Sequence, residues 1–178
     1  MNVTPERTTA ATDRGVRVRS AGHADVDAVL PLYEWLFAVP GSPPPDWDPA
    51  AGRSRLDAVC AAPDSGVLLA EDDDEVLGFC AVHLDILSVR YGRRAWVEDL
   101  AVAPQARSRG TGSLLLHAAA SWAHGRGASH LELDSAQARH DAHRFYERHD
   151  PGSRTVCFGW ELPLRPAGGA TRGDQLRT

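Results

Sequence analysis

Short stretches in which apolar residues alternate with polar ones, or run without interruption, predict β-strands along this chain. Residues Val16 to Arg19 alternate with a period of two, and apolar runs at 66–70 and 76–84 flank five consecutive acidic residues at 71–75. Two such runs joined by a polar turn predict a β-hairpin. Further strands are expected at 95–102, 131–134 and 156–162.

Apolar residues at helical spacing occupy several segments between these strands. A first helix is expected from Asp25 to Ala38, and Pro40 is expected to end it. The prolines within 39–51 predict a stiff loop after that helix. Further helices are expected at 53–61, 113–124 and 141–149.

The order of these elements, β, α, α, β, β, β, α, β, α, β, predicts a mixed α/β fold in one domain. We expect that domain to span residues 15–165, with a loose leader at 1–14 and a tail at 166–178. A chain of 178 residues is long enough to bury a substantial core.

Charge is spread unevenly over the chain, which carries 24 acidic residues against 19 basic ones, all of them arginine. The net charge of −5 argues against a protein that coats nucleic acid or an anionic membrane. The absence of lysine excludes chemistry through a lysine Schiff base or a P-loop lysine. Residues 22–86 hold two arginines and 13 acidic residues, whereas residues 87–178 hold 13 arginines and nine acidic residues.

Cysteine and histidine positions give no metal or disulfide pattern. Cys60, Cys80 and Cys157 lack C-x-x-C spacing, so we expect neither a disulfide framework nor a cysteine zinc site. His140 and His143 have a spacing compatible with a shared metal, but we interpret them as exposed or pocket-lining and expect no metal. The N-terminus lacks an apolar secretory segment and no apolar stretch is long enough to span a bilayer, so a cytoplasmic location is expected.

The segment 105–112 is rich in glycine and arginine and joins a predicted strand to a buried helix. Gly110 and Gly112 allow the backbone to turn sharply and to approach a ligand closely. The first amide groups of the helix then point to one spot, and Arg107 and Arg109 add positive charge. These features predict a phosphate site. It is neither a Walker loop nor a dinucleotide fingerprint, since the required lysine and glycine spacings are absent.

Two motifs resemble those of one large enzyme family. The stretch beginning at Glu98, E-D-L-x-V-x-P-x-x-R-x-R-G-x-G-x-x-L-L, resembles the cofactor motif of the GNAT superfamily, the Gcn5-related N-acetyltransferases. Residues 141–148, D-A-H-R-F-Y-E-R, resemble the A-x-x-F-Y-E helix of that family. The resemblance covers residues 16–163. It implies an α/β (α+β) GNAT fold, whose mixed, mostly antiparallel central sheet is splayed between strands four and five and flanked by about four helices.

The resemblance implies an N-acetyltransferase that moves acetyl from acetyl-CoA to a primary amine of a small molecule, by direct attack in a ternary complex. The pantetheine arm is expected between strands four and five and the diphosphate on the loop. The residues implied in cofactor binding are Leu100, Ala101, Val102, Arg107, Ser108, Arg109, Gly110, Thr111, Gly112 and Ser113. Another acyl-CoA, a donor on an acyl carrier protein, and a non-catalytic acetyl-CoA-binding module stay open as alternatives.

The resemblance also implies catalytic groups. Tyr146 matches the family position of the acid that protonates the CoA thiolate. Glu98 is our candidate for the base, with Asp99 as the alternative. Strand alternation puts these two carboxylates on opposite faces, so only one can face the acceptor unless the strand carries a bulge. Alternatively, both are structural, or one binds the cationic substrate.

The acceptor side is expected beneath the proline-rich loop, in the acidic part of the chain. We name Tyr33, Trp47 and Glu98 as substrate-binding candidates. Trp47, between two aspartates, could hold an ammonium group by charge and cation–π attraction, or it could simply pin a rigid loop. The acidic surroundings favour a cationic amine. We expect no nucleic-acid or membrane partner, and a homodimer stays open.

Two positions depart from the family pattern. Arg139 and His140 stand where many members carry an asparagine aimed at the pantetheine or at water. After the tyrosine helix, His149 to Gly152 replace the usual glycine and aromatic residue. Because Pro151 cannot donate to a β-ladder, the last strand is expected to begin late.

Overall fold

The computed structural model describes residues 15–73 and 75–160. One sheet has the strand order β1-β2-β3-β4-β5. Neighbouring strands are antiparallel except β4 and β5, which are parallel, so the predicted mixed, mostly antiparallel sheet is confirmed. The strands are β1 (Arg17–Ser20), β2 (Ser65–Asp72), β3 (Glu75–Ser88), β4 (Gly92–Val102) and β5 (His130–Glu132).

The first predicted helix is broken into short pieces. Pro31 lies in the middle of it, and proline has no amide hydrogen to continue an α-helical ladder. The chain therefore alternates short 3₁₀ and α segments, which together replace the predicted helix. They are η1 (His23–Asp25), α1 (Val26–Val29), η2 (Leu30–Leu32) and α2 (Tyr33–Phe37).

The other helices lie close to their predicted places. α3 (Pro49–Ala61) begins four residues earlier than expected, because the Asp48 carboxylate accepts hydrogen bonds from the amides of Ala50 and Ala51 and caps it. The turn η3 (Pro104–Ala106) leads into the phosphate loop. Two helices follow the loop, α4 (Thr111–His124) and α5 (His140–Glu147).

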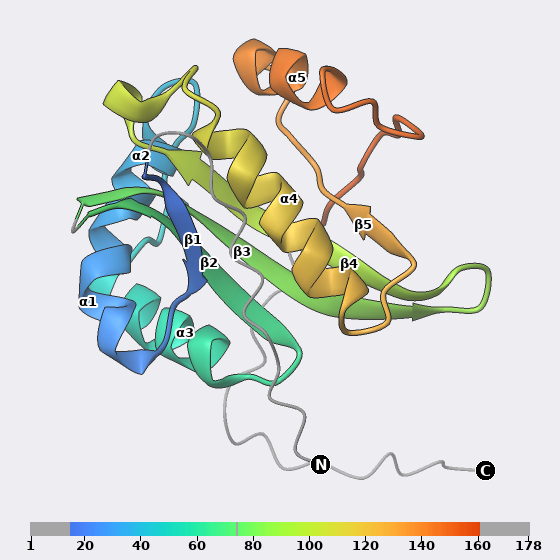
Figure 1. The fold of residues 1–178 in the computed structure, drawn as a ribbon, viewed down its shortest axis with the longest axis horizontal. Helices are drawn as coiled ribbons and strands as arrows, with labels where there is room; N and C mark the ends of the chain where they lie inside the picture. Colours follow the sequence, from blue (N-terminus) through green and yellow to red (C-terminus); the bar gives the residue numbers. More distant parts are fainter. Residues whose placement is uncertain (1–14, 74, 161–178) are drawn as a thin grey trace, which may run out of the picture.

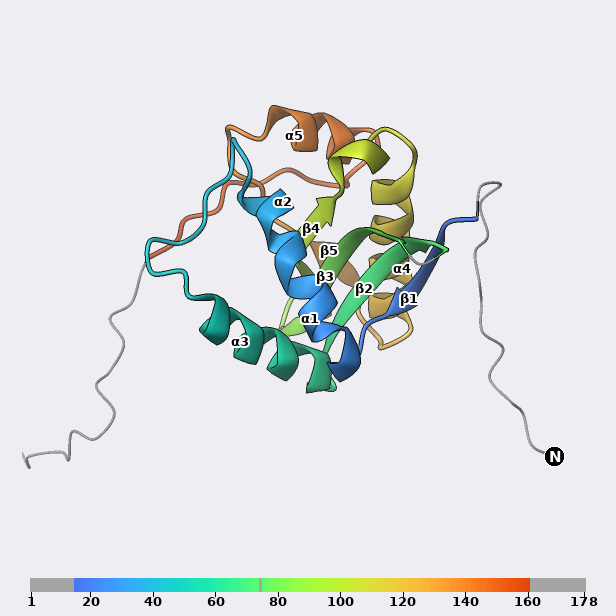
Figure 2. The same cartoon turned by 90° about the vertical axis from the view of Figure 1, so that its left-hand side faces the viewer.

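Helices cover both faces of the sheet (Figures 1 and 2). α4 lies across one face, where Leu115 is fully buried in a core with Leu68, Cys80 and Val97. The segments α1 to α3 cover the other face, where a second core forms around Phe79. α5 lies at one end of the molecule, next to the start of α4 (Figure 1).

A β-bulge divides β4 into two halves. Ala81 of β3 pairs with Asp99, but the next residue, Val82, pairs with Val97, so Glu98 is the extra residue of β4. Val97 is buried on the α4 face of the sheet. After the bulge, Ala101 is buried on the opposite face. The bulge thus reverses the alternation and turns Asp99 toward the face that α1 and α2 cover.

β4 and β5 separate soon after they meet. Their pairing covers only Arg94 to Trp96 of β4 and His130 to Glu132 of β5. Beyond Trp96, the edge of β4 that faces away from β3 has no partner strand in the described part of the chain. This opening lies where the splay between strands four and five was predicted.

The prediction of a last strand at 156–162 is wrong for the residues that can be judged. Residues 156–160 form no strand, and Val156, Phe158 and Trp160 are exposed, because this segment pairs with no described strand. Residues 161 and 162, like the leader at 1–14 and the tail at 166–178, lie outside the described residues. Among the described helices, none has the length and apolar character needed to cross a membrane.

Candidate active site

The loop before α4 has the backbone geometry of an anion site. Ser108 and Gly110 both adopt left-handed angles, with φ of 60° and 88°. Gly110 is the N-cap residue of α4, and no side chain caps this helix end. The amides of Thr111, Gly112 and Ser113 have no carbonyl partner within the helix, because they belong to its first turn. They present hydrogen-bond donors and the positive end of the helix dipole to the same place.

Gly112 leaves room for the packing of α5 against α4. A Cβ atom built on Gly112 would lie 3.2 Å from the ring of Phe145, which is tighter than ordinary van der Waals contact. The side chain of Thr111 is buried and donates a 3.3 Å hydrogen bond to the carbonyl of Ala106. α5 therefore rests directly on the first turn of α4 and holds it in place.

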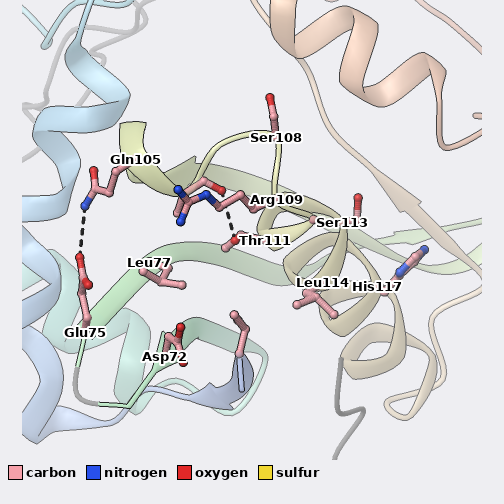
Figure 3. Close-up of a pocket in the computed structure, with 13 residues that line it drawn as sticks. Asp72, Glu75, Leu77, Gln105, Ser108, Arg109, Thr111, Ser113, Leu114 and His117 are labelled. Carbon is pink, nitrogen blue, oxygen red and sulfur yellow. Dashed lines mark hydrogen bonds between the residues drawn. The ribbon is translucent and has the colours of Figure 1, made fainter. Parts of the chain in front are cut away.

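A cavity of about 690 Å³ lies beside this loop (Figure 3). Arg109 supplies positive charge to it, and Asp72 and Glu75, from β2 and β3, supply negative charge. The cavity makes the first turn of α4 accessible to a ligand. It is lined by Val16, Asp72, Glu75, Leu77, Gln105, Ala106, Ser108, Arg109, Gly110, Thr111, Ser113, Leu114 and His117.

The free edge of β4 leads from this loop toward the centre of the sheet. The side chains of Leu100 and Val102 pack on the α4 face, whereas Ala101 is buried on the other face. Arg107 bends back and its Nε donates a 3.2 Å hydrogen bond to the carbonyl of Val102. The predicted cofactor residues therefore form one continuous path from the β4 edge to the start of α4.

On the opposite face, Asp99 meets an aromatic residue of α2. The Tyr33 hydroxyl donates a 2.9 Å hydrogen bond to Asp99 Oδ2. Burial raises the pKa of Asp99 above its ordinary value, and this hydrogen bond lowers it in part. Burial, with the charge of Asp99, also raises the pKa of Tyr33, so the phenol keeps its proton. The pair combines a desolvated carboxylate with a fixed donor.

Aromatic side chains cluster around Tyr33, the donor to this carboxylate. The ring centroids of Tyr33 and Phe79 lie 4.9 Å apart, and Trp47 stacks on Tyr33 at 6.2 Å. Phe37 meets Trp47 edge to face at 4.9 Å. Sequence analysis named Tyr33 and Trp47 but missed Phe37 and Phe79, since an apolar aromatic residue in a helix or strand looks like any other core position.

Trp47 pins the loop before α3. A Cβ atom on Gly52 would lie 2.6 Å from the indole ring, so the glycine leaves room for it. The neighbouring Asp48 is engaged as the cap of α3. Of the two aspartates beside Trp47, Asp48 is therefore not free to bind an ammonium group. This favours the simpler alternative, in which Trp47 pins a rigid loop.

Glu98 differs from Asp99 in its surroundings. It is the exposed residue of the bulge, and its Oε2 accepts a 3.1 Å hydrogen bond from Nε1 of Trp96. The bulge allows both carboxylates to lie on the same side of β4, which simple alternation did not permit. The negative charge of Glu98 helps to raise the pKa of Asp99.

Arg139 connects the β5–α5 loop to the end of α2 and to the residues that follow it. Its Nη2 donates a 2.8 Å hydrogen bond to the carbonyl of Leu36, and a Cβ on Gly41 would lie 2.4 Å from the same nitrogen. Its charge lowers the pKa of both Asp99 and Tyr146, so the guanidinium is within electrostatic range of both. Sequence analysis noted Arg139 only as a departure from the asparagine pattern.

Tyr146 lies on α5 and is half-buried. Burial, together with the nearby Cys80 thiol, raises its pKa to about 12. Since Cys80 pairs with Leu100 across β3 and β4, the phenol is in electrostatic range of the strand on which the pantetheine was expected. The hydroxyl is therefore protonated at neutral pH and able to donate.

Three histidines, His140, His143 and His149, lie on or just after α5. The rings of His140 and His143 are 6.5 Å apart, and no cluster of three or more potential metal ligands occurs among the residues that the structure describes. His149 instead contacts the first turn of α4 through Ser113. Nothing in the sequence pointed to this contact, because it joins residues 36 positions apart.

Comparison with known proteins agrees with this arrangement. The sequence profile of the acetyltransferase (GNAT) family matches residues 27–150. The uncharacterized N-acetyltransferase YhfO of Bacillus subtilis is 30% identical over 135 residues, which cover 75% of this chain and 87% of YhfO. YhdJ, an uncharacterized N-acetyltransferase of the same organism, is 35% identical over 92 residues, or 52% of this chain and 64% of YhdJ.

A streptothricin acetyltransferase of Streptomyces lavendulae is 32% identical over 118 residues, or 64% of this chain and 60% of that enzyme. The chain thus spans less than two thirds of the length of YhdJ and of the streptothricin enzyme. The fold is similar to that of the aminoglycoside N-acetyltransferase AAC(6')-Iy, solved in complex with CoA. Its TM-score is 0.71 at 15% identity, over 91% of this chain and 100% of that one. The profile match over most of the sequence shows that the chain belongs to the acetyltransferase (GNAT) family.

Proposed function

We propose that this protein transfers acetyl from acetyl-CoA to a primary amine of a small cationic molecule, with Asp99 as base and Tyr146 as acid. The observation that carries the proposal is the hydrogen bond of 2.9 Å from the Tyr33 hydroxyl to the Asp99 carboxylate. The ring of Tyr33 also packs against Phe79. The raised pKa of Asp99 favours proton uptake, and its position on β4 is next to the strand edge where the donor is expected.

The donor side of the proposal rests on the loop 107–113. Its uncapped helix start and left-handed residues suit the diphosphate of coenzyme A, and the unpaired edge of β4 suits an extended pantetheine. When bound, acetyl-CoA supplies a thioester whose C–S bond breaks as the amine forms the new C–N bond. The residues of the loop hold this donor and take no part in the proton transfers.

The acceptor side combines negative charge with aromatic surface. An ammonium group at this site is attracted by Glu98 and Asp99, and the ring of Tyr33 adds a face that favours cations. Asp99 accepts the proton that the ammonium must lose before attack. Glu98, which is exposed, helps to bind the cation. The name of the streptothricin relative, which denotes an acetyltransferase of an antibiotic, is compatible with a small-molecule acceptor.

Tyr146 completes the proposed reaction. Its phenol stays protonated at neutral pH because its pKa is about 12. It gives this proton to the sulfur that leaves, and Arg139 lies within electrostatic range to stabilise the negative charge that passes to the phenol. The proton taken up by Asp99 returns to solvent. The second proton, which the amine nitrogen loses as the amide forms, restores the phenol of Tyr146, so charge and protons balance over one turnover.

The proposal is tested by measuring thiol release from acetyl-CoA with a panel of polyamines, aminoglycosides, amino acids and peptide N-termini. We expect turnover with at least one cationic small molecule, and its loss in Asp99→Asn. Asp64→Asn, which changes an exposed carboxylate between α3 and β2, is the matched control. Binding of acetyl-CoA without thiol release across the panel would contradict the proposal and favour a non-catalytic binding module. Preference for an acyl carrier protein donor would contradict the assignment of acetyl-CoA.

A further inference from the structure

His149, just after α5, forms two hydrogen bonds that together fix where its protons are. Its Nδ1 lies 2.8 Å from the carbonyl oxygen of Phe145, and its Nε2 lies 2.9 Å from the hydroxyl of Ser113. A carbonyl oxygen can only accept, so Nδ1 carries a hydrogen and donates it. In the neutral ring, Nε2 then has no hydrogen and accepts the hydroxyl proton of Ser113.

This arrangement makes the hydroxyl of Ser113 unavailable to a phosphate. Ser113 is the third residue of α4 and lines the cavity beside the loop (Figure 3). Phosphate oxygens of a bound donor accept hydrogen bonds, so Ser113 can contribute only by turning its proton away from His149. The bare Nε2 would then face the lone pairs of the Ser113 oxygen, which is unfavourable unless the imidazole gains a proton.

Several titratable and charged side chains lie near His149. From α4, His117 faces it, with ring centroids 5.7 Å apart. From its own end of the chain, the ring of Phe145 packs at 4.5 Å, and Arg148 and Asp150 flank it in sequence. Arg109 of the loop lines the same cavity as Ser113 and His117. Asp72 and Glu75 line the same cavity from β2 and β3, and a bound diphosphate would add further negative charge beside Arg109 and the two histidines.

We infer that His149 is a positioning residue of the donor site, which takes up a proton when the phosphates of the donor bind. As imidazolium, it donates from both nitrogens, to Phe145 and to the oxygen of Ser113, and the hydroxyl proton of Ser113 turns to the phosphate. The inference rests on the proposed function, in which the loop 107–113 binds the diphosphate. It makes donor affinity dependent on pH through a residue that does not itself touch the reacting atoms.

Isothermal titration calorimetry with CoA tests this inference. Titrations at one pH in two buffers of different ionisation enthalpy give the number of protons taken up on binding. We expect the wild type to take up a larger fraction of a proton near pH 7.5 than His149→Gln or Ser113→Ala. We also expect the affinity of the wild type to fall with rising pH, by up to about tenfold per pH unit over the range in which binding takes up a proton. The fall should be smaller in His149→Gln.

His117→Gln is the matched control, because His117 neighbours His149 but has no hydrogen bond to Ser113. We expect this variant to keep the proton uptake of the wild type. Equal uptake in the wild type and His149→Gln would overturn the role of His149 and leave the proposed function intact. Loss of uptake in His117→Gln alone would also overturn it. Failure of the wild type to bind CoA would overturn the proposed function and this inference with it.

Discussion

The Tyr33 hydroxyl on α2 and the Asp99 carboxylate on β4 are joined by a 2.9 Å hydrogen bond, although they are 66 positions apart in the sequence. The bond ties the helical layer over the sheet to the strand that carries the proposed base. It also lowers the pKa of Asp99 against the effect of burial. One contact thus positions the carboxylate and adjusts its proton affinity.

Asp99→Asn is expected to lower kcat by about 10²-fold or more, since the proposed base is lost. The same change should maintain or raise the melting temperature at pH 7. The folded-state pKa of Asp99 is raised, so its ionised form costs stability above that pKa, and the cost disappears as the pH falls toward the ordinary value of 3.8. Kinetics and thermal unfolding from neutral to acidic pH check both effects.

The control for this variant is Glu98→Gln, whose parent side chain is exposed. It should raise the KM for the acceptor more than it lowers kcat. If Glu98→Gln loses kcat while Asp99→Asn keeps it, the two carboxylates have the opposite roles.

Tyr33→Phe should move the acidic limb of the pH profile of kcat/KM to higher pH. The hydrogen bond from Tyr33 stabilises the ionised form of Asp99, so its removal raises the pKa of that carboxyl further. The measurement is kcat/KM over a pH series for the wild type and the variant. An unchanged acidic limb would show that Asp99 is not the group whose ionisation limits kcat/KM at low pH.

Arg139→Gln should shift the same limb upward and raise the KM for the acceptor. The charge of Arg139 lowers the pKa of Asp99, and its hydrogen bond to Leu36 anchors the segment that leads to Trp47. Arg126→Gln is a suitable control, because Arg126 is exposed and also donates to a main-chain carbonyl. Equal effects of the two substitutions would show that the position of Arg139 has no particular importance.

Tyr146→Phe should lower kcat by about 10²-fold while the dissociation constant of CoA stays nearly constant. In the wild type the pKa of about 12 keeps the phenol protonated, so ionisation of Tyr146 should cause no loss of kcat up to about pH 10. Steady-state kinetics give kcat, and CoA titrations give the dissociation constant. A comparable loss of CoA affinity would instead indicate a packing role for the ring.

Leu115→Ala should lower the free energy of unfolding by about 2–5 kcal/mol, since Leu115 is fully buried between α4 and the sheet. Leu114→Ala, at the half-buried neighbouring position, should cost clearly less. Urea unfolding of both variants tests this, and an equal loss would contradict the assignment of the α4 core.

Much of the fold followed from local pattern. The hairpin, the buried helix after the loop and the order of the first nine elements were predictable, because alternation and helical spacing record which face of each element is buried. The last strand was not, since Val156, Phe158 and Trp160 alternate in the sequence but pair with nothing described. Alternation shows that a segment is able to pair and does not show that a partner is present.

The candidate site was likewise predictable only in part. The loop with Gly110 and Gly112 was recognisable because its residues are adjacent in sequence. The partners of Asp99 and Ser113 were not, since Tyr33 and His149 reach them only through the packing of helices. The bulge at Glu98 was also hidden, because register depends on the partner strand β3.

The bulge at Glu98 determines where β4 can gain or lose a residue. The strand is built from two segments in opposite phase, one supplying core residues to the α4 face and the other presenting Asp99 to the acceptor side. Deleting Glu98 would remove the bulge and leave regular alternation, with Val97 still on the α4 face and Asp99 still on the opposite face. A single-residue insertion or deletion should therefore be tolerated at the bulge, whereas one placed elsewhere in β4 would exchange the faces of the residues beyond it.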